Sequence, residues 1–181
     1  MSWPERIEGE GFVLRSWDAS DVDDLVFHAN DPQVSRHLGE RFPYPYTEQD
    51  AQLFVAHALH LQGEKTFAIE INGRACGGIG LHPGEGVERH SAELGYWLGR
   101  AYWGEGVATK AVRALVPHAL RELKLYRLQA RVFADNPASM RVLERCGFIH
   151  EAILRRQVVK HERLLDMHIY AMTRDRLDAA E

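Results

Sequence analysis

Two glycines near the middle of the chain, Gly104 and Gly106, have the spacing of a loop that binds phosphate. Glycine lets the backbone approach an anion closely, and Ala108 adds little bulk just after them. The first amides of a helix have no partners within the helix and lie at the positive end of its dipole. A loop of small residues at that point can therefore surround a phosphate with N–H groups. The alternative is that the glycines only form a tight turn between a strand and a helix.

The residues around this loop supply the elements that a phosphate site needs. Residues 92–98 alternate as in a half-buried strand, with Ala92, Leu94, Tyr96 and Leu98 on one face and Glu93, Gly95 and Trp97 on the other. From Val107 the period becomes helical, since small and apolar residues recur at offsets of three and four: Ala108, Ala111, Val112, Leu115 and Ala119. We therefore predict a strand, a glycine loop and a helix in succession.

Composition narrows the classes of function. The 181 residues fit one domain, residues 1–181, and 45% of them are hydrophobic and 27% charged, which is typical of a globular protein. The net charge of -4 and the lack of a basic run argue against binding nucleic acid or anionic membranes through bulk charge. No signal peptide and no apolar run long enough to span a bilayer is present, so we expect a cytoplasmic protein that does not bind a membrane.

Cysteines and histidines give no metal pattern. Cys76 and Cys146 have no Cys-x-x-Cys partner and are expected to be small core residues. The ten histidines include His57 and His60, three apart on a predicted helix, but no carboxylate or cysteine completes a site. We expect surface histidines and no metal.

The rest of the chain predicts a mixture of helices and hairpins. Strands are expected at residues 12–15 and 128–133, helices at 20–29, 47–62, 107–122 and 138–146, and hairpins from 66–71 with 74–81 and from 148–158 with 164–172. Because two hairpins interrupt the alternation of strands and helices, we predict a mixed α/β layer and not a doubly wound parallel sheet.

Several local signals refine this prediction. Thr47 and Asp50 fit a capping box, Asn72-Gly73 is a strong hairpin signal, and Pro117 is expected to kink or loosen its helix. Three glycines in the second arm of the first hairpin, Gly77, Gly78 and Gly80, indicate a bulge or a close backbone approach. Residues 30–46 are predicted to be a loop that carries aromatic side chains, which either line a pocket or cover the edge of the core.

The element order and two local motifs resemble the GCN5-related N-acetyltransferase (GNAT) family over nearly the whole chain, and within it the RimJ/RimL branch, which acetylates protein N-termini. The first motif, residues 98–108 (LGRAYWGEGVA), is similar to the family's pyrophosphate loop, with Trp103 where Gln or Arg is usual. The second is residues 136–148 (NPASMRVLERCGF). The resemblance implies a mostly antiparallel sheet with a splayed central strand pair and helices on both faces.

The resemblance also implies a binding site for acetyl-CoA. The pantetheine arm would pair with the backbone around Trp97 and Leu98, where the central strand parts from the strand that contains Leu128. Asn136 would touch the same arm. The pyrophosphate would be held by amides of Trp103, Gly104, Glu105, Gly106, Val107, Ala108 and Thr109.

Two residues are candidates for catalysis. Many relatives have a tyrosine seven residues after the asparagine, which protonates the leaving thiolate, but this position is Leu143 here. In the RimJ/RimL branch a serine three residues after the asparagine is proposed instead, and Ser139 occupies that position, where it can also cap a helix. Glu93 is the best candidate base, directly or through water, unless it is only a solvated strand carboxylate or part of an ion pair. Direct attack without a covalent enzyme intermediate is expected, because Ser139 has no evident triad partners.

The sequence leaves the identity of the acceptor amine least determined. A protein or peptide N-terminal amine is favoured by the branch resemblance, and its pKa near ~8 leaves it partly neutral, whereas a lysine near ~10.4 needs more help from a base. The alternative acceptor is a small-molecule amine, such as an aminoglycoside, a polyamine or an amino-acid derivative. Two other functions remain as alternatives: a non-catalytic sensor that binds acyl-CoA, and a dinucleotide oxidoreductase. Residues 30–46 and 147–159 are expected to shape the acceptor site, with Tyr44 and Tyr46 as contacts. The apolar edge of the last hairpin can support a homodimer.

Overall fold

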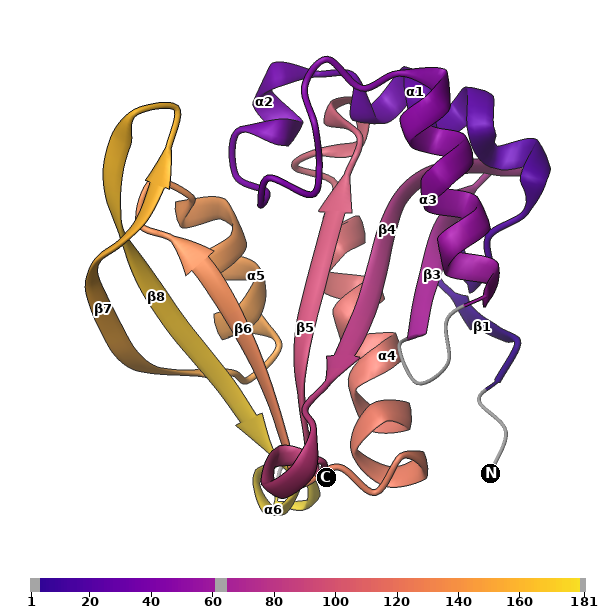
Figure 1. The fold of residues 1–181 in the computed structure, drawn as a ribbon. Helices are drawn as coiled ribbons and strands as arrows, with labels where there is room; N and C mark the ends of the chain where they lie inside the picture. The colour runs from indigo at the N-terminus through magenta and orange to yellow at the C-terminus, as the bar shows by residue number, and fades with distance from the viewer. Residues whose placement is uncertain (1–3, 61–64, 180–181) are drawn as a thin grey trace.

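A single eight-stranded sheet forms the centre of the computed structural model, which describes residues 4–60 and 65–179 (Figure 1). The strand order is β1-β2-β3-β4-β5-β6-β8-β7. The strands are β1 (Arg6–Gly9), β2 (Phe12–Arg15), β3 (Lys65–Ile71), β4 (Arg74–Pro83), β5 (Ser91–Leu98), β6 (Arg127–Phe133), β7 (Ile149–Lys160) and β8 (Arg163–Thr173).

Every neighbouring pair of strands is antiparallel except β5 and β6, which are parallel. These two strands pair only at their beginnings, where Ser91, Ala92 and Glu93 face residues 127–129. Beyond Glu93 they diverge, as Figure 1 shows. The prediction of a mixed, mostly antiparallel sheet with a splayed central pair is confirmed, and a doubly wound dinucleotide-binding fold is ruled out.

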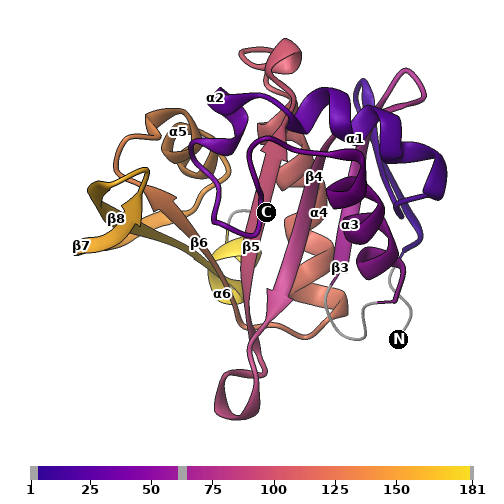
Figure 2. The ribbon, with the colours of Figure 1, turned by 45° about the horizontal axis from the view of Figure 1, so that its top comes forward.

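Helices cover both faces of the sheet (Figure 2). They are α1 (Val22–Ala29), α2 (Pro32–Ser35), α3 (Glu48–His60), α4 (Val107–Glu122), α5 (Pro137–Arg145) and α6 (Arg174–Asp178). One face packs against α4 and α5, and the opposite face of strands β3 and β4 packs against α1 and α3. Helices therefore cover both faces of the sheet at β3 and β4, the strands next to β5.

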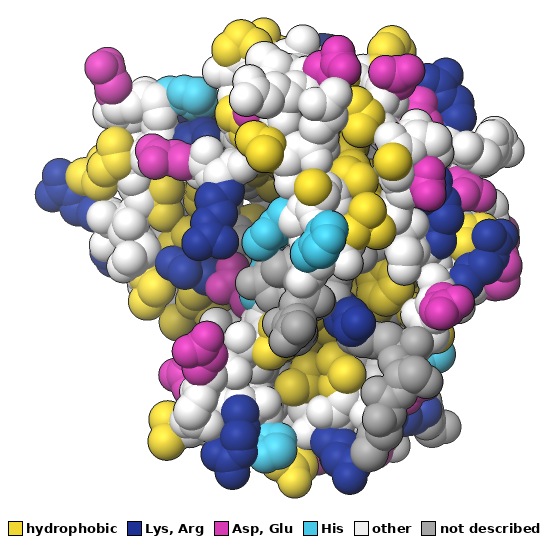
Figure 3. All heavy atoms as spheres, turned by 45° about the vertical axis from the view of Figure 1, so that its right-hand side comes forward, with side chains coloured by type: hydrophobic (Ala, Val, Ile, Leu, Met, Phe, Trp, Pro, Cys, Tyr) yellow, Lys and Arg dark blue, Asp and Glu magenta, His cyan; other side chains and the backbone are white. Residues whose placement is uncertain are grey.

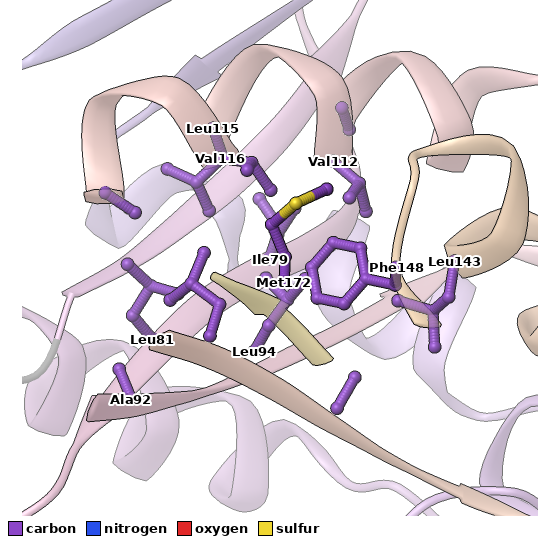
Figure 4. Packing of buried hydrophobic residues seen from close by; sticks show 14 of the residues in the cluster. Ile79, Leu81, Ala92, Leu94, Val112, Leu115, Val116, Leu143, Phe148 and Met172 are labelled. Carbon is purple, nitrogen blue, oxygen red and sulfur yellow. The ribbon is translucent and has the colours of Figure 1, made fainter. Parts of the chain in front are cut away.

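Strand alternation and helix periodicity produce the larger core together (Figure 4). Ile79 and Leu81 of β4 lie beside Tyr96 and Leu94 of β5 in register, on the face that meets α4. The stripe of α4 that packs onto them contains Ala111, Val112, Leu115, Val116 and Ala119. Full burial of a leucine is worth about 1.5–3 kcal/mol, so this contact holds the helix that starts at the glycine loop firmly on β5.

Several local predictions are confirmed. The Thr47 backbone amide and hydroxyl both donate to the Asp50 carboxylate, and Thr47 Oγ1 accepts from the Asp50 amide at 3.2 Å, which completes the capping box of α3. Asn72 and Gly73 both have positive φ in the turn between β3 and β4. The close approach expected at the β4 glycines is also present, since a Cβ on Gly77 would lie 2.5 Å from the Trp97 carbonyl oxygen.

Three short elements were not expected from the sequence: β1, α2 and α6. The segment predicted as loop between residues 30 and 46 contains α2, because Asp31 caps it by accepting from the Gln33 amide at 2.7 Å and Pro32 occupies its first turn. A helix of four residues is too short to show a helical period in the sequence, so whether it forms depends on tertiary contacts.

Helix α4 continues through Pro117 to Glu122. The predicted end of α3 at residues 61–62 lies outside the described residues.

The surface carries charges of both signs. Figure 3 shows Lys and Arg side chains interspersed with Asp and Glu across the face that it presents. The expected apolar edge of the last hairpin is exposed, and its large members are Ile149, Ile153, Leu154, Val159 and Leu164; a dimer through it stays a prediction. Among the described residues, no helix is long and apolar enough to cross a membrane.

Candidate active site

A cavity of about 720 Å³ opens where β5 and β6 diverge. Its walls come from β5, the glycine loop and first turn of α4, β6 and the start of α5, with α2 and residues 37–40 on one side and the end of β7 on another. In Figures 1 and 2, α2 lies across the open ends of the diverging strands. The splayed strands therefore create a site with a cofactor side at α4 and α5 and a second side bordered by α2 and the β7–β8 hairpin.

The glycine loop has the geometry expected for a phosphate. Gly104 and Gly106 have φ values of 83° and 78°, and Gly106 directly precedes α4. The first backbone hydrogen bond of α4 joins the Lys110 amide to the Gly106 carbonyl at 3.0 Å, so the amides of residues 107–109 have no partner within the helix. A Cβ on either glycine would meet no heavy atom within 4 Å. The open space and the free amides fit a pyrophosphate group at this point.

Trp103 closes the loop back onto β5. Its indole Nε1 donates to the Leu98 carbonyl at 2.7 Å, and its own amide donates to the Arg100 carbonyl at 3.2 Å. The Trp103 amide is therefore already bonded, in contrast to the expectation that all amides from residue 103 onward face the phosphate. The indole at this position shapes the loop and ties it to the end of the splayed strand.

Glu93 lies at the point where β5 and β6 begin to diverge. It is the last β5 residue that pairs with β6, opposite Gln129, and on its other side it pairs with His82 of β4. Its side chain lines the cavity and has no hydrogen bond or ion pair with the other described residues. Gly95, next on the same face, leaves open space, since a Cβ there would meet only His82 Nε2 at 4.0 Å. The Glu93 carboxylate is thus free to accept a proton from a group bound beside it.

Ser139 lies on the opposite wall, at the start of α5. Asn136 caps this helix, and its Oδ1 accepts from the Ser139 amide at 3.2 Å. Ser139 is therefore not the cap, and its hydroxyl is used differently: Oγ lies 2.7 Å from the hydroxyl of Tyr96 on β5. Burial raises the pKa of Tyr96, although the hydrogen bond to Ser139 opposes this shift, so Tyr96 stays protonated at neutral pH. When Tyr96 donates to Oγ, the Ser139 proton is free to be donated to a group in the cavity.

Asp135 connects the walls on the side of the cavity bordered by α2. Its Oδ2 accepts from Arg36 at 3.0 Å and from Arg163 of β8 at 3.0 Å, and its Oδ1 lies 3.7 Å from His37 Nε2. Burial alone would raise the pKa of Asp135. The hydrogen bonds from Arg36 and Arg163 and the charges of Arg36 and His37 outweigh this effect and hold it below its usual value. One carboxylate thus joins the segment after α2, the turn before α5 and the β7–β8 hairpin.

Most of the residues expected in the site line one cavity. They are Glu93, Trp97, Leu98, Trp103, Gly104, Gly106, Val107, Ala108, Thr109, Asn136 and Ser139. Glu105 is exposed and does not line it. Tyr96 was missed as a site residue, because strand alternation assigned it to the core face and no sequence signal pairs it with Ser139.

The two tyrosines expected to contact the acceptor are placed elsewhere. Tyr46 is 4% exposed and packs with Trp17 and Ala51 in the smaller core beneath α1 and α3. Its amide donates to Asn30 Oδ1 at 3.0 Å, which fixes the chain there. Tyr44 is half exposed and does not line the cavity. The aromatics of this segment cover the core edge, and the residues that reach the cavity are those of α2 and positions 37–40.

Neither cysteine lines the cavity. Cys76 is buried, as expected. Cys146 is partly buried, and burial raises the pKa of its thiol to about 11, so it stays protonated at neutral pH. Among residues 4–60 and 65–179, no group of three or more His, Cys, Asp or Glu side chains is arranged to hold a metal ion.

A splayed parallel strand pair in a mostly antiparallel sheet, with a phosphate loop at the next helix, defines an acyl-CoA-binding transferase fold. Residues 12–149, more than half of the chain, match the family model described as an acetyltransferase (GNAT) domain. The chain therefore belongs to the GNAT family, and it is an N-acetyltransferase that uses acetyl-CoA.

Two curated relatives illustrate the similarity. The uncharacterized N-acetyltransferase p20 of Bacillus licheniformis is 27% identical over 172 residues, which cover 93% of this chain and 96% of the relative. The ribosomal-protein-serine acetyltransferase of Escherichia coli is 32% identical over 114 residues, which cover 62% of this chain and 63% of the relative.

A solved structure agrees with the fold. RimL, a ribosomal L7/L12 α-N-protein acetyltransferase in complex with coenzyme A, superimposes with a TM-score of 0.85 at 24% identity and covers 95% of this chain and 99% of its own. At this identity the likeness concerns the fold alone.

Proposed function

We propose that this chain, acting as one domain, acetylates the N-terminal amine of a protein or peptide, with Glu93 as the base and Ser139 as the proton donor. The observation that carries the assignment is the Ser139 hydroxyl, held 2.7 Å from the buried Tyr96 hydroxyl in the same cavity that Glu93 lines. The E. coli relative that acts on a ribosomal-protein serine supports the class of acceptor.

Each residue has a defined task in this proposal. Acetyl-CoA supplies the activated acetyl group. The amides of residues 107–109 bind its pyrophosphate, the unpaired edge of β5 beyond Glu93 aligns its arm, and the side-chain nitrogen Nδ2 of Asn136 contacts that arm. Glu93 takes the proton that the amine loses as its nitrogen bonds to the acetyl carbon, and Ser139 gives a proton to the sulfur as the bond between sulfur and the acetyl carbon breaks. Solvent then returns the proton of Glu93 to Ser139, which restores both groups.

Acetyl transfer to a panel of acceptors tests the proposal. The panel contains a peptide with a free N-terminal serine, the same peptide with a blocked N-terminus and an internal lysine, spermidine and an aminoglycoside, and transfer is followed by thiol release. We expect the highest kcat/KM for the free N-terminus. Turnover of spermidine or the aminoglycoside alone would instead identify a small-molecule enzyme.

Variants test the two catalytic assignments. Ser139→Ala and Glu93→Gln should each lower kcat by about 10²–10⁴-fold, while acetyl-CoA still raises the Tm. Glu88→Gln, which removes an exposed carboxylate away from the cavity, is the matched control and should keep parental turnover. Full activity in the Glu93→Gln variant would remove Glu93 from the mechanism.

A further inference from the structure

Lys160, the last residue of β7, lines the cavity and is largely buried, and its side chain has no partner among the described residues. Only 9% of its surface is exposed. Its side chain forms no hydrogen bond or ion pair with any other described residue. Asp21, the other described Asp, Glu, Lys or Arg that is buried to this degree, is paired with Arg15 at 2.7 Å. The stem of Lys160 is buried and its ammonium has no acidic side chain of the described residues within ion-pair distance, so a negative group in the cavity would pair with it.

The neighbouring charges do not supply that negative group. Arg163, which faces Lys160 in the hairpin register, donates to Asp135. Asp135 Oδ2 accepts from Arg163 and Arg36, whereas its Oδ1 lies 3.7 Å from His37 and has no hydrogen-bond partner among the described residues. Neither Asp135 nor Glu40, the carboxylate that lines the cavity after α2, forms an ion pair with Lys160, so a negative group on a bound molecule can take that place.

Charge is distributed unevenly around the cavity. Arg131 of β6 lines it as well, is exposed, and its side chain forms no hydrogen bond or ion pair with the described residues. Arg141 and Arg145 of α5 also line the cavity, so its cations lie on β6, β7 and α5, whereas its two carboxylates are Glu93 of β5 and Glu40 after α2. A molecule with an amine at one end and an anion at the other matches this arrangement, and a polyamine would place a second cation against Lys160.

We propose that Lys160 binds a carboxylate of the acceptor, so that the preferred acceptors are amines with an acidic group close to the amine. This inference rests on the proposed function, in which Glu93 receives the proton of the attacking amine. The carboxylate comes either from an acidic side chain next to a peptide N-terminus or from the α-carboxylate of a free amino acid.

Matched acceptors that differ in one carboxylate test the inference. The first pair is the C-terminally amidated peptides Ser-Asp-Ala-Ala and Ser-Asn-Ala-Ala, and the second is serine and serinamide. Each is assayed by thiol release with the parent, with Lys160→Met, and with the control Lys124→Met, which removes an exposed lysine outside the cavity. Met keeps the length and apolar stem of Lys160, and a Tm measurement checks that each variant is folded.

The expected result is a kcat/KM about tenfold or more higher for the acidic member of a pair in the parent and in Lys124→Met. This preference should disappear in Lys160→Met, with kcat/KM for the neutral member and KM for acetyl-CoA unchanged. A preference within the peptide pair identifies a side-chain carboxylate, and one within the serine pair identifies an α-carboxylate.

The other outcomes separate the two proposals. If the peptides are acetylated but neither pair shows a preference for its acidic member, or the preference survives Lys160→Met, the Lys160 inference is overturned and the peptide acceptor stands. If serine alone is acetylated in a Lys160-dependent way, the inference stands and the peptide acceptor fails. A rise in KM for acetyl-CoA in Lys160→Met would place Lys160 at the cofactor and overturn the inference. If none of the four acceptors is acetylated, both proposals fail.

Discussion

At the scale of single residues, the contact between Tyr96 and Ser139 distinguishes this site from what its motifs alone imply. The tyrosine that many relatives have seven residues after the asparagine is replaced by Leu143, which is fully buried in the core. A different tyrosine, from β5, brings its hydroxyl to Ser139 at 2.7 Å. Because Tyr96 stays protonated, it would orient the serine hydroxyl in the proposed proton donation and so act as a positioning residue.

Tyr96→Phe should lower kcat about tenfold, since Ser139 loses the donor that orients its proton, and should leave KM for acetyl-CoA unchanged. Because Tyr96→Phe removes one buried hydrogen bond, it should also reduce the free energy of unfolding by about 1 kcal/mol. Steady-state kinetics and urea denaturation measure both effects.

A double-mutant cycle gives the control for Tyr96. If Tyr96 acts through Ser139, Tyr96→Phe has no further effect on kcat in a Ser139→Ala background. Additive losses in the double variant would show that the two hydroxyls act independently.

At the scale of elements, the glycine loop and α4 form one unit. The strand ends at Leu98, the indole of Trp103 returns to its carbonyl, and two glycines with positive φ lead into a helix whose buried stripe is packed on β5. The free amides of the helix are thereby held in a fixed position, which reduces the entropy lost when a phosphate binds.

Gly106→Ala tests this unit against a matched control, Gly73→Ala. Both glycines have a φ of 78° and an open position at Cβ, but Gly106 lines the cavity and Gly73 lies in the turn between β3 and β4. Both variants should lose about 1 kcal/mol of stability, because alanine is strained at positive φ. Only Gly106→Ala should raise KM for acetyl-CoA, by about tenfold or more.

Urea denaturation and acetyl-CoA titration of the initial rate provide the two measurements. An equal change of KM in both variants would mean that strain in the fold, and not the space at the loop, controls cofactor binding.

At the scale of the whole molecule, the sheet consists of two halves, β1 to β5 and β6 to β8, that pair with each other over a short stretch of β5 and β6. Three register pairs join β5 to β6, and beyond them the halves are bridged by Arg36 and His37 through Asp135. A bridge of this kind holds the segment after α2 against the turn before α5 while leaving the space between the strands open.

Asp135→Asn should lower the free energy of unfolding by about 1–3 kcal/mol at pH 7, because charged hydrogen bonds are lost. The pKa of Asp135 is below its usual value in the folded protein. Its stabilisation is therefore fully present above the unfolded value of about 3.9 and is lost as the pH falls through the folded value. Urea denaturation should show a constant difference from about pH 7 to pH 5.5 and a smaller one near pH 3.5.

The control for this experiment is Asp178→Asn, which removes an exposed carboxylate 3.8 Å from Arg121 and should change stability by less than about 1 kcal/mol. A difference between parent and Asp135→Asn that stays the same at every pH would contradict the role of the charge. A raised acceptor KM in Asp135→Asn, with KM for acetyl-CoA unchanged, is the expected functional sign of a loosened bridge.

The sequence by itself determined the features that depend on neighbouring residues. Alternation from Ala92 to Leu98, the two glycines and the helical stripe after Val107 each reflect backbone geometry over a few residues, and the structure has all three in the predicted order. The capping box at Thr47 and the turn at Asn72-Gly73 are local for the same reason.

Tertiary structure alone decided the contacts between distant segments. The register of β5 and the start of α5 bring Tyr96 to Ser139, 43 positions apart, and the fold of the last hairpin leaves Lys160 unpaired in the cavity. Tyr46 was expected at the acceptor and is in the core, because burial beneath α1 and α3 depends on packing that no local pattern specifies. Side-chain pairs across the sheet and the shape of a cavity follow from how whole elements pack, which residue spacing along one strand or helix does not encode.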